Sequence, residues 1–286
     1  MAESTGQITL RKENISKVVT GFALQEYVMK QVCTIESSSS WKETYFKETA
    51  ADLAGHANDA IDGVPRLANF PYGEVEWTET STRNLKHGFE GVISWEDEAT
   101  SNIAVIARTL LRIARAVTKS VDTEIYDQLV ANAGNTVTIA ALSEWNAVAI
   151  ANRDPIQNIL DAMMEISIDN YNPRQNGYLI LNPTDFSNLM GNASVRNAGQ
   201  FFTDDVTKNG KIGRFVGLTI LVSNTVAASG ALVVVGKEAC TWKSVKPLTV
   251  ETITEPGISK TIRAWEVGSI QVTNPDAVCK IVNTEA

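Results

Sequence analysis

The sequence is poor in the residues that most often build catalytic and metal sites. It contains only two histidines, His56 and His87, and neither lies in a spacing typical of zinc ligands. Gly-x-Ser-x-Gly, Walker and Gly-x-Gly-x-x-Gly motifs are all missing. The sequence therefore predicts no catalytic residues, no bound cofactor and no metal ligands. His87, which lies beside Lys86 and Gly88, is expected on a solvated turn.

Cysteine is scarce, and long apolar runs are missing. Cys33, Cys240 and Cys279 are far apart in the sequence, with no C-x-x-C pair and no adjacent histidine. This spacing favours buried thiols over metal ligands or a disulfide framework. No apolar run reaches the roughly 18 residues of a membrane helix, and residues 1–13 do not resemble a secretory signal. We expect cytoplasmic synthesis and no membrane partner.

Positive charge is also in deficit. The chain has 25 Lys and Arg residues against 33 Asp and Glu residues, and its formal net charge is -8. Such a balance argues against a surface built to grip nucleic acid, because phosphate binding needs clustered basic side chains. Hydrophobic residues make up 44% of the 286 residues, which is ample for one large folded domain or two.

Apolar spacing in the N-terminal region predicts a polar arm that carries one short helix. In residues 16–34 the apolar side chains recur near helical spacing, which indicates an amphipathic helix. Four serines at 37–40 interrupt this pattern. An extended region is expected from Trp41 onward.

The next residues are typical of loops and strands. Glycines and prolines are too dense between residues 50 and 73 for a helix or a central strand. Residues 74–83 and 89–98 have extended character and are separated by the polar segment 84–88. This arrangement predicts a long β-hairpin with its turn at 84–88. The hairpin is too polar to bury itself as a core.

The clearest pattern starts after Trp95. Glu96, Asp97 and Glu98 place negative charge where a helix N-terminus is stabilised by it, a role that needs no metal ion. One apolar stripe follows, which comprises Ile103, Ile106, Leu110, Ile113, Val117, Val121, Ile125 and Leu129. A single helix over residues 97–129 would span about 50 Å at roughly 1.5 Å per residue. Its period favours packing on a sheet over a coiled coil.

The second half of the chain predicts a small α/β unit followed by strands. Asp154 and Pro155 open a helix, which is expected to end at Asn172-Pro173. The apolar run 177–183 is typical of a short strand, and a turn and a third helix should follow it. Residues 191–212 are expected in an exposed loop, and the rest of the chain in strands that return to close both sheets.

This order of elements resembles the Hong Kong 97-type major capsid proteins of tailed viruses. The segment from LKHGFEGVISWEDE to YDQLV, residues 85–130, resembles the family's passage from an extended loop into a spine helix. GYLILNPTDFSNLMGN is similar to a strand and helix of its axial domain, and residues 210–242 are similar to a later module. The ordered set is more specific than any one of these motifs.

The resemblance implies an α+β fold with four parts. They are an N-terminal arm and short helix at 1–40, an extended loop at 41–95, a peripheral domain with the spine helix at 96–139 and 239–286, and an axial domain at 140–238. It also implies a coat protein that assembles through hexamers and pentamers into an icosahedral shell around double-stranded DNA. The expected location is the virion, after assembly in the host cytoplasm.

The resemblance further implies contacts and partners. The extended loop should reach over a neighbouring subunit, and deleting residues 50–90 should leave a folded subunit that does not assemble. Portal and decoration proteins are further expected partners, and the short arm predicts either a separate scaffolding protein or none. Residues predicted at the inter-subunit contact are Trp41, Phe46, Trp77, Arg83, Lys86, His87 and Phe89.

Basic residues at helical spacing are the one local feature that suggests nucleic acid. Arg108, Arg112, Arg115 and Lys119 line one flank of the predicted long helix. This flank either faces packaged DNA, weakly and without sequence preference, or forms salt bridges to acidic neighbours. Two other functions remain open for the whole chain, namely a cellular shell that binds a cargo peptide and a two-domain hydrolase.

Overall fold

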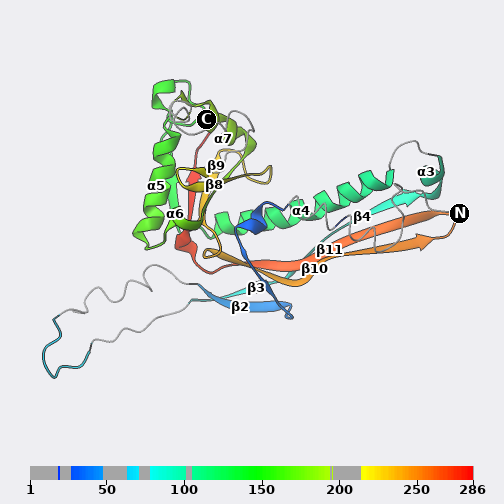
Figure 1. Ribbon diagram of the computed structural model, residues 1–286, viewed down its shortest axis with the longest axis horizontal. Helices are drawn as coiled ribbons and strands as arrows, with labels where there is room; N and C mark the ends of the chain where they lie inside the picture. Colours follow the sequence, from blue (N-terminus) through cyan, green and yellow to red (C-terminus); the bar gives the residue numbers. More distant parts are fainter. Residues whose placement is uncertain are drawn as a thin grey trace.

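The computed structural model of the chain combines helices with three sheets (Figure 1). A four-stranded sheet carries one long helix, a six-stranded sheet is flanked by shorter helices, and a two-stranded hairpin reaches away from both. This confirms the predicted mixture of helix and sheet. The residues that the structure describes are 19, 27–47, 63–70, 78–100, 105–193, 195 and 214–285.

The four-stranded sheet has the order β1-β10-β11-β4, in which β1 is parallel to β10 and the other pairs are antiparallel. A turn at Gly257, whose φ of +75° suits glycine, joins the two longest strands. Helix α4 packs closely on one face, because a Cβ atom on Gly91 would lie 2.6 Å from Thr109 Cγ2. The strands are β1 (Thr34–Ser37), β4 (Leu85–Ser94), β10 (Cys240–Glu255) and β11 (Ser259–Val272).

The predicted long helix corresponds to two helices, α3 (Trp95–Thr100) and α4 (Val105–Ala131). Residues 101–104 between them lie outside the described residues. The prediction of one helix over 97–129 is therefore wrong at its N-terminal end. Its apolar stripe is confirmed from Leu110 onward, since α4 buries Leu110, Ile113, Val117, Val121, Ile125 and Leu129. Ile106 is half-buried, and Ile103 lies outside the described residues.

The six-stranded sheet has the order β5-β12-β9-β6-β8-β7. Strand β12 lies between β5 and β9, so the end of the chain closes this sheet, while β10 and β11 complete the other. The predicted return of the C-terminal strands to both sheets is confirmed. The strands are β5 (Asn135–Thr138), β6 (Gly177–Leu181), β7 (Arg214–Phe215), β8 (Leu218–Val222), β9 (Gly230–Val235) and β12 (Val278–Val282).

Helix α5 (Pro155–Ile168) packs against β5 and β12, and its start is as predicted. The Asp154 carboxylate accepts the N–H of Gln157, which caps the helix. The helix ends at Ile168, before Asn172, and Met164 faces solvent although it was predicted on the apolar face. The shorter elements nearby are η2 (Ile150–Asn152), α6 (Pro173–Asn176), α7 (Pro183–Gly191) and η3 (Pro275–Ala277).

The predicted hairpin with its turn at 84–88 is wrong. Strand β3 (Thr78–Arg83) pairs with β2 (Lys42–Lys47), whereas β4 pairs with β11. Residues 85–88 lie inside β4, where Leu85 is opposite Gly268 and His87 is opposite Glu266. The sequence pattern predicted the extended backbone of residues 78–83 and 89–94 correctly, but residues 95–98 belong to helix α3. The pattern carries no information about which strand is the partner.

The predicted helix over 16–34 is wrong at its C-terminal end. The chain forms a single 3-10 turn, η1 (Met29–Gln31), and then enters β1 at Thr34. The N–H groups of Val28 and Met29 donate to the Asp122 carboxylate on α4. Apart from Val19, residues 1–26 lie outside the described residues.

Candidate assembly surfaces

The β2–β3 hairpin projects from the body and carries large exposed apolar side chains. Lys42 is opposite Arg83 and Lys47 is opposite Thr78, and residues 63–70 lie at the far tip of the connection between the strands (Figure 1). At this tip Leu67 is 99% exposed and Phe70 is 83% exposed. Trp41 and Phe46 are also exposed. Gathered apolar side chains of this size mark an interaction surface.

Sequence reasoning missed Leu67 and Phe70. The density of glycine and proline between residues 50 and 73 was interpreted only as loop chemistry. The overlooked pattern was the pair of large apolar side chains inside that loop, at positions where a packed core cannot form.

Asn84 fixes the base of the hairpin to the body. It is buried, and its backbone N–H donates to the Trp41 carbonyl at 3.1 Å. Its side-chain amide donates to the Ser40 carbonyl at 2.6 Å, while its side-chain oxygen accepts from the Ser269 hydroxyl at 2.7 Å. These bonds to β11 and to the start of β2 set the direction in which the hairpin leaves the body.

The residues predicted at the inter-subunit contact lie in two places. Trp41, Phe46 and Arg83 belong to the hairpin or its base, and all three are exposed. Lys86 and Phe89 are exposed on β4, in the four-stranded sheet. The structure therefore does not gather the set on one loop, and Trp77 lies outside the described residues.

His87 is buried in β4, so its predicted place on a solvated turn is wrong. Its Nδ1 atom lies 2.9 Å from the Ser120 hydroxyl of α4. Burial lowers the pKa of His87, and Lys30 lowers it further, while Glu266 opposes this shift. The residue was misplaced because Lys86 and Gly88 beside it are typical of turns, although both lie within the strand.

The sheet face opposite α4 presents rows of paired side chains. Gly91 and Ile262 point toward α4, so their neighbours Glu90, Val92 and Arg263 point to the other side. Arg263 Nε lies 2.6 Å from Glu90 Oε2. Further along this face, the Trp265 ring has Lys86 Nζ at 5.4 Å and Lys246 Nζ at 4.9 Å. Val92, Ile253 and Ile258 are exposed toward its outer end.

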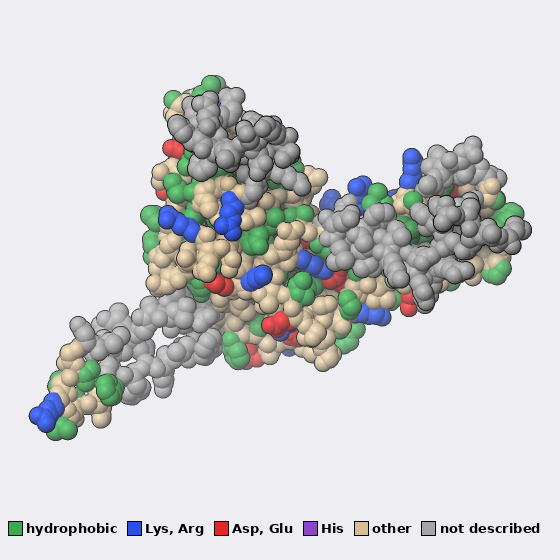
Figure 2. All heavy atoms as spheres, viewed as in Figure 1, with side chains coloured by type: hydrophobic (Ala, Val, Ile, Leu, Met, Phe, Trp, Pro, Cys, Tyr) green, Lys and Arg blue, Asp and Glu red, His purple; other side chains and the backbone are tan. Residues whose placement is uncertain are grey.

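The basic residues of α4 form a stripe of four side chains, Arg108, Arg112, Arg115 and Lys119, that reach the surface. Figure 2 shows Lys and Arg side chains gathered where this helix lies. Among the described residues, Arg108, Arg112 and Lys119 form no ion pair, and the Arg112 guanidinium lies 5.8 Å from the Phe89 ring centre.

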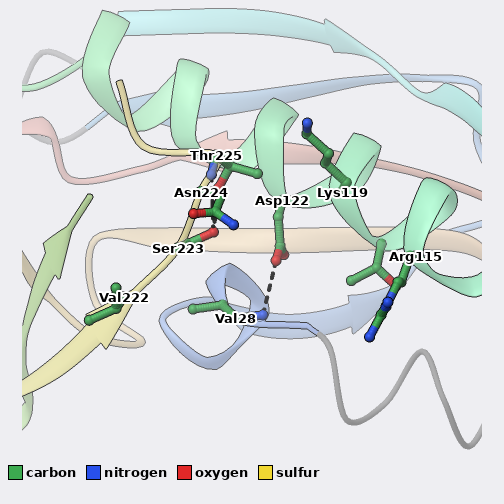
Figure 3. Close-up of a pocket in the computed structure, with 9 residues that line it drawn as sticks. Val28, Arg115, Lys119, Asp122, Val222, Ser223, Asn224 and Thr225 are labelled. Carbon is green, nitrogen blue, oxygen red and sulfur yellow. Dashed lines mark hydrogen bonds between the residues drawn. The ribbon is translucent and has the colours of Figure 1, made fainter. Parts of the chain in front are cut away.

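A cavity of about 480 Å³ lies beside this stripe (Figure 3). Arg115 and Lys119 line it from α4, and Ser223, Asn224 and Thr225 line it from the segment after β8. Asp122 also lines it, so the two positive charges lie beside a carboxylate, together with several hydroxyl and amide groups.

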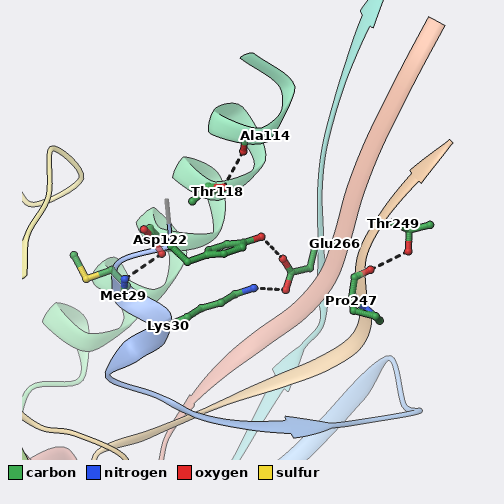
Figure 4. A network of polar contacts seen from close by, with 9 residues as sticks. Met29, Lys30, Ala114, Thr118, Asp122, Pro247, Thr249 and Glu266 are labelled. Atoms are coloured by element: carbon green, nitrogen blue, oxygen red, sulfur yellow. Dashed lines mark hydrogen bonds and ion pairs between the residues drawn. The ribbon is translucent and has the colours of Figure 1, made fainter. Parts of the chain in front are cut away.

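A buried polar network joins the segment before β1 to the body (Figure 4). The Tyr27 hydroxyl donates to Glu266 at 2.6 Å, and Lys30 Nζ lies 2.5 Å from the other oxygen of the same carboxylate. Burial raises the pKa of Tyr27 and lowers the pKa of Lys30, although Glu266 opposes the shift of Lys30. The network holds residues 27–30 against α4 and β11.

Asp122 forms the second half of this network. Its two carboxylate oxygens accept the N–H groups of Val28 at 3.0 Å and Met29 at 3.2 Å (Figures 3 and 4). Burial raises the pKa of Asp122 to about 6, and the two backbone hydrogen bonds oppose this shift. The carboxylate therefore titrates in a range where ordinary aspartates stay ionised.

Within the described part of the chain, no group of three or more His, Cys, Asp or Glu side chains is arranged to hold a metal ion. No helix of that part is long and apolar enough to cross a membrane. The features that the geometry offers are thus a projecting hairpin, a sheet face that no described residue covers and a basic helix flank.

The sequence model of a family described as phage capsid protein matches residues 78–281, from the start of β3 almost to the end of β12. The chain therefore belongs to the phage capsid protein family, which confirms the resemblance to tailed-virus coat proteins. No protein with a curated description matches the sequence.

Solved structures share the fold at low sequence identity. The virus-like particle from Pyrococcus furiosus is 10% identical, with a TM-score of 0.65 over 96% of this chain and 100% of that chain. The capsid of the cyanophage P-SCSP1u is 14% identical, with a TM-score of 0.64 over 99% and 92%. Mycobacterium phage Che8 is 17% identical, with a TM-score of 0.61 over 100% and 96%.

Proposed function

We propose that the chain is a major capsid protein that assembles through hexamers and pentamers into an icosahedral shell around double-stranded DNA. The observation that carries this proposal is the projecting hairpin with Leu67 and Phe70 exposed at its tip. A monomer gains no stability from such a structure, whereas a neighbouring copy can cover it. Many contacts of this kind, repeated by symmetry, give a stable closed assembly.

The proposed division of the chain follows the Hong Kong 97-type plan. Helix α4 takes the place of the spine helix, with β10 and β11 beside it in a peripheral domain at 96–139 and 239–286. The axial domain is 140–238, and the arm is 1–40. Because β4 pairs with β11 in the body, we place the projecting part of the loop at 41–83 instead of 41–95.

The proposed inter-subunit contact joins the hairpin of one subunit to the uncovered sheet face of the next. Trp41, Phe46 and Arg83 would contribute from the hairpin. Lys86 would contribute from the receiving sheet face, beside Trp265, whereas Phe89 lies on the α4 side of β4, near Arg112, and would contact a neighbour from that side. We leave buried His87 out of the direct contact, because only its neighbours in β4 reach solvent.

The basic flank of α4 is proposed to face packaged DNA. Its support is the position of Arg108, Arg112, Arg115 and Lys119 at exposed sites on one side of one helix. The contact is electrostatic and independent of the DNA sequence, because the phosphate groups are the same for every base. With a net charge of -8 on the chain, binding should be weak and sensitive to salt.

The other partners follow from this role. Assembly would take place in the host cytoplasm, with portal, scaffolding and decoration proteins as further partners, and the product would be part of the virion. A cellular cargo compartment is less favoured, because the matching family model is a phage capsid protein and the likeness to the Pyrococcus particle shows the fold alone. The same family supports a structural role over the hydrolase hypothesis.

Electron microscopy of the purified full chain tests the proposal. Closed particles of uniform size are expected, either spontaneously or with a co-expressed scaffolding protein. A chain that stays monomeric under all these conditions would contradict the shell function. Nuclease treatment of particles from infected cells then tests the contents, since enclosed DNA is protected whereas a protein cargo gives no protected nucleic acid.

A further inference from the structure

Two of the three cysteines lie in contact. Cys33 Sγ is 3.1 Å from Cys240 Sγ, and both residues are buried and free. Cys279, which is also buried and free, lies in β12 of the other sheet. The contact joins residues that are 207 positions apart in the sequence. Such a pair is a specific product of the tertiary structure.

The backbone around the pair suits a covalent link. Cys33 directly precedes β1 and Cys240 begins β10, and the next residues, Thr34 and Thr241, are register partners in the parallel pair. Neighbouring strands lie about 4.8 Å apart, and a disulfide needs Cα atoms about 4.4–6.8 Å apart. The Lys237 N–H also donates to the Val32 carbonyl at 2.7 Å, which holds the two segments together beside the thiols.

We propose that Cys33 and Cys240 form a modification site, a dithiol that is oxidised to a disulfide by exchange with a small-molecule disulfide such as oxidised glutathione. The thiolate of one cysteine attacks the glutathione disulfide and releases one glutathione. The second cysteine then displaces the other glutathione from the mixed disulfide. One S–S bond forms in the protein and one breaks in the oxidant, and the two protons pass to the released glutathione thiols.

Access to the pair requires local opening. Both side chains are buried, but β1 is a four-residue strand at the edge of its sheet, and edge elements of this size open more readily than the core. The hydrogen bond with Cys240, followed by burial, raises the pKa of the Cys33 thiol, so the closed pair reacts slowly. The site therefore stays reduced in a reducing cytoplasm and is oxidised slowly outside it.

The disulfide would fix the segment before β1 covalently to the start of β10 in the body of the protein. It closes a loop that contains the β2–β3 hairpin, α4 and most of the six-stranded sheet. It also prevents residues 27–30 from leaving Asp122 and Glu266, which hold them in the closed state. The idea that the disulfide stabilises the protein only after release from the host cell rests on the proposed virion function. The oxidation of the cysteine pair itself does not depend on that function.

The test uses the purified, fully reduced chain in buffers with increasing ratios of oxidised to reduced glutathione. Expected results are a fall in free thiols from three to one and a non-reducing digest that contains a peptide joining Cys33 to Cys240. The thermal midpoint should rise by roughly 5–10 °C and return after reduction. C279S should form the same link, while C33S and C240S should keep two free thiols and show no rise.

In a second experiment the chain is refolded from urea in the same glutathione buffers, so that glutathione can reach both thiols before they become buried. If the thiols stay free there as well, or if Cys279 takes part in the main product, the proposal is overturned. A link that forms only between chains overturns it too. Electron microscopy of the oxidised and reduced samples reports assembly separately, so loss of shells does not count against the disulfide, and a missing disulfide does not count against the shell.

Discussion

Asp122 shows how one buried side chain shapes the local backbone. It lies on the face of α4 that meets residues 27–30, and its carboxylate accepts the N–H groups of Val28 and Met29. These bonds hold the segment against α4 just before the chain passes through η1 into β1. The sequence contains no pattern that links Asp122 to these two residues, which are more than 90 positions away.

The raised pKa of Asp122 predicts a pH-dependent stability. A folded-state pKa of about 6 against 3.8 in a free aspartate means that the folded protein favours the protonated form, a preference worth about 3 kcal/mol. This contribution is fully present below pH 4 and is lost as the pH rises through 6. The free energy of unfolding of the wild type minus that of D122N should therefore fall by up to about 3 kcal/mol between pH 4 and pH 7.

Urea denaturation at several pH values measures this difference. D127N is the matched control, because Asp127 is an exposed carboxylate on the same helix. A difference between wild type and D122N that stays constant from pH 4 to pH 7 would contradict the assignment.

The ion pair of Lys30 and Glu266 predicts a second effect at the residue scale. E266Q leaves the Lys30 ammonium buried without its counter-ion and removes the charged acceptor of Tyr27, so it should lower the free energy of unfolding by roughly 3–5 kcal/mol. The double variant K30M/E266L removes both charges and should be clearly more stable than E266Q. Equal losses in the two variants, measured by denaturation in urea, would show that the pair itself is unimportant.

At the scale of elements, the periodicity of apolar residues predicts well whether a segment is a helix or a strand. It predicts poorly which strands pair with each other. The stripe on α4 follows from spacing alone, because a helix of this period must bury one face. The extended backbone of residues 89–94 in β4 is predicted for the same reason, whereas 85–88 were expected in a turn. The pairing of β4 with β11 instead of β3 is not predicted by the pattern of the strand, and α4 packs on β4 at Gly91, where Thr109 and Ile113 approach closely.

The pairing of β2 with β3 changes how the hairpin should be tested. Deleting residues 50–90 would remove six residues of β4 and unfold the body, so that expected outcome is withdrawn. Replacing residues 48–77 by Asn-Gly joins Lys47 to Thr78, which are register partners, through a two-residue turn. This variant should stay folded and monomeric by circular dichroism and light scattering, and should form no shells.

A matched control keeps the loop and removes only its exposed apolar side chains. L67S/F70S should weaken assembly without lowering the thermal midpoint, because both side chains face solvent in the single chain. Normal shells from the variant that lacks 48–77 would contradict the role of the hairpin.

At the scale of the whole molecule, the basic flank predicts salt-dependent binding to DNA. R108Q/K119Q removes two charges of α4, while Arg112 contacts Phe89 and is left in place. The slope of log K for double-stranded DNA against log salt should become less steep by about 0.9 for each phosphate that the variant no longer neutralises. Fluorescence anisotropy at several salt concentrations measures this slope. R174Q/R214Q, at exposed positions on α6 and β7, is the control for the change in net charge.

The sequence by itself determined the mixed fold, the apolar face of α4, the start of α5, the buried cysteines and the phage coat family. These features depend on local spacing and composition, which are properties of short segments. The tertiary structure alone decided the partner of each strand, the division of the long helix, the burial of His87 and the contact of Cys33 with Cys240. These features depend on which distant segments pack against each other. The free energy that favours one packing over another is spread over many residues, so the sequence of a single segment cannot predict it.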